Sequence, residues 1–427
     1  MRLSRAKAIY YGLGNLMGVG SGLIVQWLMY YYSPPKNAGL TPLAPIFVMG
    51  VVFLFGRAID AISDPLIGWW SDRTYTRWGR RKPFIVAGCI LMALSQTLIW
   101  LPPIHAVSLI NAVYAAIMLG IFWFGFTAAI APYLALLPEI AEDDAERIRL
   151  TTYQALFLQI SVVITGLVVP LFLLRYLGFF LTSVVLTVIM FVAMTPLVLT
   201  IHERVTPDKV AKGLGFLEAI KLTLKNRVFV TYLFMIFFLQ LAINMMNLVL
   251  PYGVTVLGGL QKYYVGYFYI PLLIVSLITL PIYKSLSVRW GKKKVFMMSM
   301  LGLSIASIAA SFIGWIPVSP LLMIIGIGGF VGIFLIPQFM MPNAFIAEIS
   351  DLDESITGYR REAIYFGVQG LIWKSAAGAA ALLSGWVMDM FGYNPGHDMG
   401  VRLVYIISSV LLVIAALILT RYRIEKH

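Results

Sequence analysis

Two aspartates, Asp60 and Asp64, lie four residues apart inside a long apolar segment of the chain. A charge in the middle of a bilayer costs several kcal/mol, from about 2.5–3.5 on insertion scales upward, so such residues usually face a pathway and have partners. A spacing of four places both carboxylates on one face of a helix, with Arg57 one turn away. Two carboxylates with hydroxyl oxygens nearby suit a hard cation such as Na⁺, or a proton that the pair shares.

Two hydroxyl groups complete the candidate cation ligands, and a lysine is the candidate coupling residue. Ser63 lies beside the aspartates, and Thr127, in a later apolar segment, supplies another oxygen if the two segments pack together. Lys374 lies 12 residues from the end of its segment, about 18 Å deep, as Asp60 does in its own. With Arg57 and the two aspartates it sums to zero formal charge, so an arriving cation can replace Lys374 as the partner of the carboxylates. The alternative is an inert ion-pair network that fixes helix packing, for which four buried charges are a costly device.

The elements that must position these residues are membrane-spanning helices. Apolar residues make up 60% of the 427 and charged residues 12%, whereas a soluble domain carries about twice that charge. A spanning helix needs about 20 apolar residues. The apolar runs predict an all-α integral membrane protein with twelve such helices, at residues 8–32, 43–71, 84–102, 108–138, 151–173, 177–200, 228–252, 264–285, 295–313, 318–346, 362–389 and 400–421.

The longest polar connection divides the helices into two groups of six. We expect an N-terminal six-helix half at residues 1–200 that carries the cation site, a linker at 201–227, and a C-terminal half at 228–427. Residues 216–224 have amphipathic spacing, which favours a helix lying on the membrane surface.

The net charge of +13 is distributed in a way that indicates topology. Of the 32 Lys and Arg residues, 26 lie in the N-terminus or in every second loop after it, four lie in the opposite loops, and two lie inside helices. This asymmetry predicts that both termini and the central linker are cytoplasmic, in a plasma membrane that we expect to be a bacterial inner membrane. The basic excess therefore gives no reason to expect a nucleic-acid partner. The expected partners are membrane lipid and a small-molecule substrate, and we expect a monomer.

Other kinds of site have little support in the sequence. The only cysteine is Cys89, and the four histidines fall in predicted loops or the tail. There is no phosphate-cradling glycine loop and no nucleophile elbow. We therefore expect neither an enzyme nor a cofactor, and the coupling ion, Na⁺ or H⁺, is the only small partner besides the substrate.

An internal repeat supports the two-halved layout. The basic motif at residues 77–84 recurs at 289–296, 212 residues later and again between the second and third helices of its half. Acidic segments at 132–149 and 342–360 form a second pair. Two matched pairs at nearly one offset predict duplicated halves of the major facilitator type, with the substrate site between them near the midplane. The candidate cytoplasmic gate, whose ion pairs would break on opening, comprises Asp72, Arg73, Arg77, Arg80, Arg81, Glu139, Arg149, Glu348, Arg360 and Arg361.

These motifs also carry a family resemblance. The run from Gly56 to Trp69, the basic motif at 77–83, the segment Thr357–Ala363 with the later Lys374, and the sequence Leu28–Tyr32 resemble the glycoside–pentoside–hexuronide:cation symporters along essentially the whole chain. The resemblance implies symport of a glycoside-like solute with a cation by alternating access.

The resemblance also implies roles for single residues. Asp60 and Asp64 match the family's paired cation-binding aspartates, and Thr127 matches a threonine ligand. Ser63 stands where a well-known member has an asparagine ligand. Lys374 matches the lysine that communicates with the cation site, and Arg57 matches an arginine on the same helix.

The sequence departs from the family at the sugar site. Gly18, Ile130 and Ala155 stand where a galactoside-binding member has two aspartates and an arginine. The cation machinery is thus kept while the known galactoside clamp is missing. A sodium-dependent lysophospholipid transporter of animals resembles the same family, so an amphiphile is the alternative substrate.

The remaining polar residues of the helices favour a polar ligand, because amides and an aromatic platform suit a neutral hydroxylated solute. The alternative for each amide is a hydrogen bond between helices, which is common in membranes. A non-transporting receptor or assembly factor of the same fold is a third possibility, against which the buried charges argue. The candidate substrate-binding residues are Asn15, Gln154, Gln240, Asn244, Asn247, Gln338, Gln369 and Trp373.

Overall fold

The computed structural model describes residues 4–74, 76–141, 143–201, 203, 223–224, 226–357 and 362–422. The chain divides into two compact units. The first comprises Met1–Pro34 and Gly39–Asp208, and the second comprises Pro35–Ala38 and Lys209–His427. The described residues form helices joined by short turns, and no β-strand occurs among them beyond two isolated bridges.

The first unit contains the site region and is built from long helices with two local irregularities. A 3₁₀ turn, Gly14–Gly18, interrupts the first predicted helix, and a π-helical stretch, Ile164–Leu173, follows α7. The helices are α1 Arg5–Leu13, α2 Val19–Tyr32, α3 Ile46–Arg73, α4 Lys82–Leu98, α5 Leu109–Ala135, α6 Leu137–Ile140, α7 Asp144–Val163, α8 Leu174–Tyr176 and α9 Gly178–Thr200.

The second unit has a similar set of long helices. They are α11 Arg227–Tyr252, α12 Val265–Trp290, α13 Lys292–Ser311, α14 Pro320–Thr357, α15 Glu362–Phe391 and α16 Met399–Arg421. Short turns at Lys36–Ala38 and Lys262–Tyr264 and a π-helical stretch at Gly253–Leu257 complete the described elements.

The helices are membrane-spanning in length and composition. Within the described ranges, eleven are long and apolar enough to cross a membrane, and Lys82–Leu98 is a shorter apolar helix at the position of the predicted third span. Each of the twelve predicted helices therefore has a counterpart, which confirms the all-α membrane fold.

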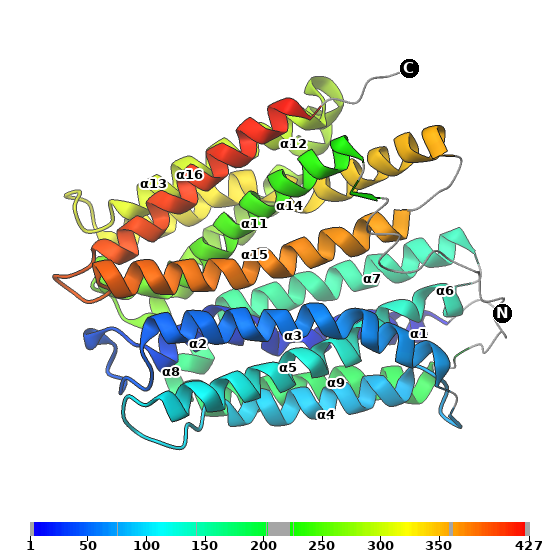
Figure 1. The fold of residues 1–427 in the computed structure, drawn as a ribbon, viewed down its shortest axis with the longest axis horizontal. Helices are drawn as coiled ribbons and strands as arrows, with labels where there is room; N and C mark the ends of the chain where they lie inside the picture. Colours follow the sequence, from blue (N-terminus) through cyan, green and yellow to red (C-terminus); the bar gives the residue numbers. More distant parts are fainter. Residues whose placement is uncertain are drawn as a thin grey trace. The chain divides into compact units, whose positions relative to one another are not determined.

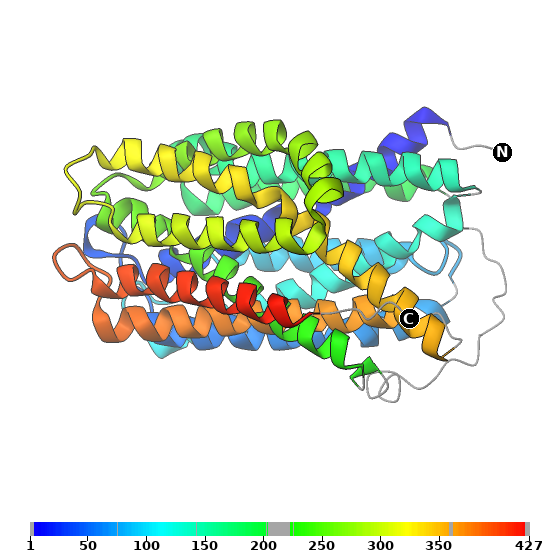
Figure 2. The ribbon, with the colours of Figure 1, turned by 90° about the horizontal axis from the view of Figure 1, so that it is seen from above.

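The two units repeat one packing scheme, and within each unit the long helices lie side by side (Figures 1 and 2). In the first unit α3 and α4 pack against α5, α4 also packs against α9, and α1 packs against α7. In the second unit α12 and α13 pack against α14, α13 also packs against α16, and α11 packs against α15. Each helix pair in the first unit therefore has a counterpart at the same positions in the order of helices of the second unit, as expected for a duplicated six-helix unit.

Several predicted helix ends are wrong because apolar runs mark the thickness of the bilayer rather than the length of the helix. The helix predicted to end at 346 continues to Thr357, so Glu348 lies on α14 and not in a loop. The helix predicted to begin at 151 begins at Asp144, so Arg149 is helical too. Arg289 lies in the last turn of α12. The predicted surface helix at 216–224 lies almost wholly outside the described residues.

Candidate functional site

The candidate cation ligands converge where α3 packs against α5. The Oγ1 atom of Thr127, on α5, lies 3.2 Å from Asp60 Oδ1 and 3.1 Å from Asp64 Oδ1. Ser63 Oγ lies 3.0 Å from Thr127 Oγ1 and 3.0 Å from the backbone oxygen of Asp60. Thr127 could supply an oxygen only if its helix packs against that of the aspartates. The structure shows this packing of α3 against α5.

The chemistry of this oxygen cluster fits a hard cation. Thr127 has one hydroxyl proton and two carboxylate oxygens within reach, so it cannot fully satisfy both carboxylates at once. All the side-chain atoms that could coordinate a cation here are carboxylate or hydroxyl oxygens, the ligands preferred by hard cations. No group of three or more His, Cys, Asp or Glu side chains that could hold a metal ion occurs in the described parts of the chain, and this cluster has two carboxylates.

The two aspartates differ in burial. Asp60 is only 1% exposed, and Ser63 and Thr127 are likewise buried. Asp64, one turn further along α3, is exposed. The cluster thus has one buried carboxylate, Asp60, and one exposed carboxylate, Asp64.

Arg57 completes the cluster on α3. Its Nη1 donates to Asp60 Oδ2 at 3.1 Å, and its guanidinium lies over the ring of Trp123 on α5, with Cζ 3.7 Å from the ring centroid. Sequence reasoning missed Trp123, because no spacing rule connects it with a residue 66 positions earlier. The predicted coupling residue Lys374 lies on α15 in the second unit, and its role remains a prediction.

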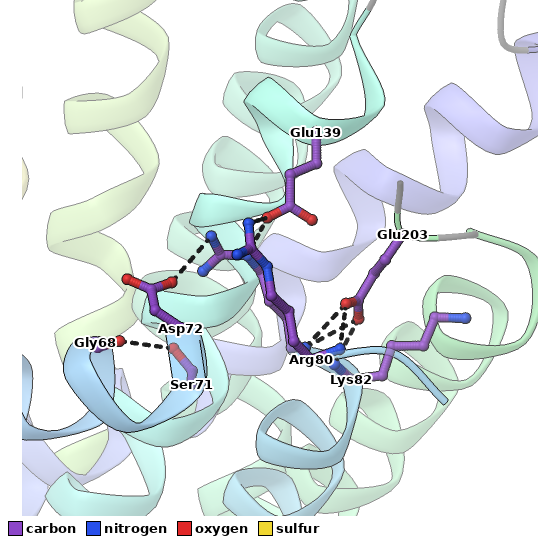
Figure 3. A network of polar contacts seen from close by, with 8 residues as sticks. Gly68, Ser71, Asp72, Arg80, Lys82, Glu139 and Glu203 are labelled. Atoms are coloured by element: carbon purple, nitrogen blue, oxygen red, sulfur yellow. Dashed lines mark hydrogen bonds and ion pairs between the residues drawn. The ribbon is translucent and has the colours of Figure 1, made fainter. Parts of the chain in front are cut away.

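Four of the predicted gate residues, Asp72, Arg80, Arg81 and Glu139, form an ion-pair network in the first unit (Figure 3). The Oε1 atom of Glu139 accepts hydrogen bonds from Arg80 Nη2 at 2.7 Å and from Arg81 Nε at 2.6 Å. Arg81 Nη2 also lies 3.4 Å from Asp72 Oδ1 at the end of α3. The basic motif between α3 and α4 is thereby tied to the end of α3 and to α6.

Glu203, just after α9, is the member of this network that sequence reasoning did not identify. Its carboxylate accepts hydrogen bonds from the backbone N–H groups of Arg80, Arg81 and Lys82, at 2.6–3.1 Å (Figure 3). An acidic side chain at this place is favourable because the first N–H groups of a helix have no intrahelical partner and carry a partial positive charge. The sequence signal for Glu203 was an acidic residue directly after the sixth span, but nothing distinguished it from the other charged residues of the linker.

The second unit has a related network at the repeated motif. Lys292 Nζ lies 2.5 Å from Glu348 Oε2, and Tyr422 donates to the same oxygen at 3.2 Å. Lys293 Nζ donates to the backbone oxygens of Thr420 and Tyr422 at the end of α16. In both units the basic motif therefore binds the chain segment that leaves the last helix of the half.

The other predicted gate residues have local contacts or lie elsewhere. Arg73 stacks on Trp69, Arg149 pairs with Glu146 one turn earlier on α7, and Arg77 is exposed. Arg360 and Arg361 lie outside the described residues.

Two of the predicted substrate residues meet in the first unit. Asn15 Nδ2 donates to the backbone oxygen of Gln154 at 2.6 Å, and Gln154 Nε2 lies 2.9 Å from Tyr11 Oη and 3.1 Å from Tyr133 Oη. Tyr133 in turn donates to the backbone of Tyr11. These residues join helices α1, α5 and α7 into one polar cluster.

The predicted substrate residues of the second unit fall into two groups. Gln338 and Gln369 are buried and bond to neighbouring helices, through Ser299 and Tyr232 respectively. Gln240, Asn244 and Asn247 instead form a half-buried stripe on α11, with Asn244 Nδ2 donating to the Gln240 backbone oxygen and Tyr269 donating to Asn247. Trp373 is 37% exposed on α15.

Comparison with known proteins agrees with this architecture. The inner membrane symporter YicJ of Escherichia coli is 25% identical over 98% of this chain and 92% of its own length. The isoprimeverose transporter of Lactiplantibacillus pentosus is 22% identical over 88% of this chain and 78% of its own. A sodium-dependent lysophosphatidylcholine symporter of Gallus gallus is 29% identical, but only over 36% of this chain and 28% of its own length.

Comparison with solved structures finds the same fold in a known transporter. The nucleoside transporter NupG superposes on 98% of this chain with a TM-score of 0.68 at 14% identity, and the alignment covers 99% of that structure. The model of the family described as MFS/sugar transport protein matches residues 11–426. The chain therefore belongs to this family of major facilitator transporters, and it is a multi-pass membrane transporter rather than an enzyme.

Proposed function

We propose that this transporter takes up a glycoside-like or other small polar organic solute together with Na⁺ or H⁺ bound at Asp60 and Asp64. The observation that carries the proposal is the convergence of both carboxylates on the Thr127 hydroxyl, with Ser63 beside it. The ion pair of Arg57 with Asp60 alone would serve an inert network that fixes helix packing, whereas the hydroxyl oxygens beside the two carboxylates also suit a cation. The names of YicJ, a symporter, and of the sodium-dependent lysophosphatidylcholine symporter support cation-coupled symport, and the family description supports a sugar-like substrate.

The proposed mechanism is alternating access with the cation binding first. The cation neutralises the aspartates, releases Lys374 from them, and pre-orders the substrate site, so that each ligand raises the affinity of the other. The ion pairs of Glu139 with Arg80 and Arg81 would act as part of a cytoplasmic gate. In this mechanism the two halves are residues 1–200 and 228–427. Both termini lie in the cytoplasm, the membrane is a bacterial inner membrane, and the transporter is a monomer.

A thermal-shift screen of the purified protein tests the function. Sugars and lysolipids are added with and without Na⁺, at constant ionic strength with choline as the replacement cation. We expect stabilisation by Na⁺ alone and a larger shift when a glycoside is also present, because a ligand that binds only the folded protein raises its apparent stability. Shifts that are equal in Na⁺ and choline at every pH, for every solute, would count against cation coupling.

The alternative substrate is an amphiphile, and the partial similarity to the lysophosphatidylcholine symporter favours it. The two substrate classes differ in how far their binding affinity depends on hydrogen bonds from the amides on α11. A polar solute must replace its hydrogen bonds to water with bonds to protein groups, whereas an amphiphile gains most of its affinity from apolar burial.

We expect Asn244→Ala to weaken binding of a polar substrate at least several-fold while leaving cation binding intact. Asn244 Nδ2 bonds within its own helix, so its Oδ1 is the group to offer to a ligand. Leaving one buried substrate group unpaired costs about 1–3 kcal/mol, or roughly 5- to 150-fold in affinity. Substrate binding to the purified variants by calorimetry, with and without Na⁺, measures the change.

Thr231→Ala is the matched control on the same helix. The Thr231 hydroxyl also donates to a backbone oxygen four residues earlier, that of Arg227, but near the start of α11. It should leave substrate affinity unchanged. If Asn244→Ala behaves like this control and lysolipids alone protect the protein, the substrate is an amphiphile.

A further inference from the structure

Each basic motif of the internal repeat begins with an arginine and a tryptophan that are both exposed. This Arg–Trp pair is Arg77–Trp78 in the first unit and Arg289–Trp290 in the second. Both arginines are exposed, and the tryptophans are 65% and 50% exposed. Among the described residues, neither arginine side chain forms a hydrogen bond or an ion pair.

The later basic residues of each motif are engaged within the protein instead. In the first unit Arg80 and Arg81 bind Glu139. In the second unit Lys292 binds Glu348. The division of the motif is therefore the same in both units, and the ion-pair networks leave the Arg–Trp pair available to a partner outside the chain.

Two different backbone conformations present the pair. In the first unit its residues are the central two of a turn, which Gly79 closes by donating its N–H to the Thr76 backbone oxygen at 3.1 Å. The Thr76 hydroxyl donates back to the Gly79 oxygen at 2.6 Å. In the second unit the pair ends helix α12, and Gly291 follows at φ +80°. The shared exposure of the pair thus does not come from a shared local conformation.

Both pairs lie at the end of a membrane-spanning helix. Trp290 is the last residue of one span, and Trp78 lies just after the end of another. Near the end of α3 the exposed Trp69 ring lies under the Arg73 guanidinium, whose Cζ is 4.3 Å from the ring centroid. Tryptophan is enriched at the boundary between bilayer and water, where lipid headgroups lie. The position of the pairs therefore fits a contact with headgroups.

The chemistry of the pair fits a phosphodiester. A guanidinium presents a fork of N–H donors that matches two phosphate oxygens, and the indole N–H is a further donor. The charge nearby also favours an anion. Residues 284–294 contain no acidic residue, and Asp72, the only acidic residue of 69–81, pairs with Arg81. Each basic residue close to an anionic membrane surface adds about fivefold to lipid affinity.

We propose that each Arg–Trp pair binds the headgroup phosphate of an anionic phospholipid, with the guanidinium and the indole N–H as donors. The protein thus has two equivalent lipid sites, one in each unit. Each site belongs to a motif whose later residues bind Glu139 or Glu348, so it connects that ion-pair network with the surrounding lipid. The inference involves neither the substrate nor the coupling ion, and its test is independent of the proposed function.

Native mass spectrometry of the purified protein in detergent tests the proposal by counting bound lipids. With phosphatidylglycerol as the probe, the wild type should bind two molecules more tightly than any others. Arg77→Gln and Arg289→Gln should each weaken one of these two binding events about fivefold, and the double variant should weaken both. Trp78→Phe keeps an aromatic ring but removes the N–H donor, so it should weaken the same site as Arg77→Gln by a smaller factor.

Arg227→Gln is the matched control. Arg227 is an exposed arginine at the start of α11 and is followed by Val228 instead of a tryptophan. The control removes the same charge and should leave both tight binding events unchanged, while thermal unfolding reports whether each variant is folded. If all three arginine variants lose affinity equally, the lipid responds to net charge alone and the pairs are not binding sites.

Two further probes test the identity of the ligand. Phosphatidylcholine has the same phosphate with a compensating positive charge, and it should bind both sites more weakly than phosphatidylglycerol. Glycerol 1-phosphate lacks acyl chains and should compete only at far higher concentrations. Equal binding of the two lipids would overturn the assignment to anionic phospholipids. Competition by glycerol 1-phosphate at the concentrations of the lipid would overturn it in favour of a soluble phosphate.

Discussion

Replacement of Asp60 by Asn should abolish cation binding in a protein that still folds. The substitution keeps the size of the side chain but removes one of the two negative charges that would attract the ion. Two unit charges about 4 Å apart interact by about 4 kcal/mol at an effective dielectric constant of ~20. A loss of that size corresponds to more than a hundredfold in affinity. Calorimetric titration with Na⁺ measures it, and thermal unfolding reports whether the variant is folded.

Asp72→Asn is the matched control. Asp72 lies on the same helix, is exposed, and pairs with Arg81 at the end of α3 rather than with the hydroxyl cluster. The substitution removes the same charge and should leave cation affinity within a few-fold of the wild type. If Asp60→Asn still binds Na⁺ as tightly as this control does, the cation site lies elsewhere in the protein.

The core of the candidate site was predictable because burying a charge in a membrane is costly. Asp60 and Asp64 stood out in an apolar run, and their spacing alone placed them on one face of a helix. The spans were predictable for a related reason, since the bilayer thickness sets the length of each apolar run. The family resemblance then singled out Thr127, and the contact of α3 with α5 brings its hydroxyl to the carboxylates.

Contacts between distant helices were not predictable from one sequence. Trp123 is an ordinary aromatic residue of an apolar helix until α3 brings Arg57 over it. Glu203 resembles any linker charge until the start of α4 is found beside it. The same limit applies to buried amides, since a glutamine that faces a ligand and one that bonds a neighbouring helix, as Gln338 does, look alike in a sequence.

Helix ends were the other weak point. The polar end of α14 has no proline between Pro342 and Thr357 to stop it, and it continues as a helix beyond the apolar run. Glu348 is therefore presented to Lys292 by a rigid helix and not by a loop.

Gly79→Ala should destabilise the protein much more than Gly291→Ala, although the two glycines occupy equivalent places in the repeated motif. Both have positive φ, +108° and +80°, so a side chain strains either backbone by roughly 1–3 kcal/mol. At Gly79 the new Cβ would also lie 2.4 Å from Glu203 Cδ, whereas at Gly291 nothing lies within 4 Å. The first substitution must therefore displace the carboxylate from the start of α4, and the second displaces nothing.

The difference between the two variants measures what Glu203 contributes. Losing a capping side chain costs about 0.5–2 kcal/mol, and hydrogen bonds to a charged group are worth about 1.5–3 kcal/mol, so Gly79→Ala should cost about 1–3 kcal/mol more than Gly291→Ala. Thermal unfolding of both purified variants in one detergent checks this. In a Glu203→Ala background the extra cost of Gly79→Ala should disappear, leaving only the backbone strain that Gly291→Ala also shows. An extra cost that persists without Glu203 would mean that the displaced carboxylate is not its cause.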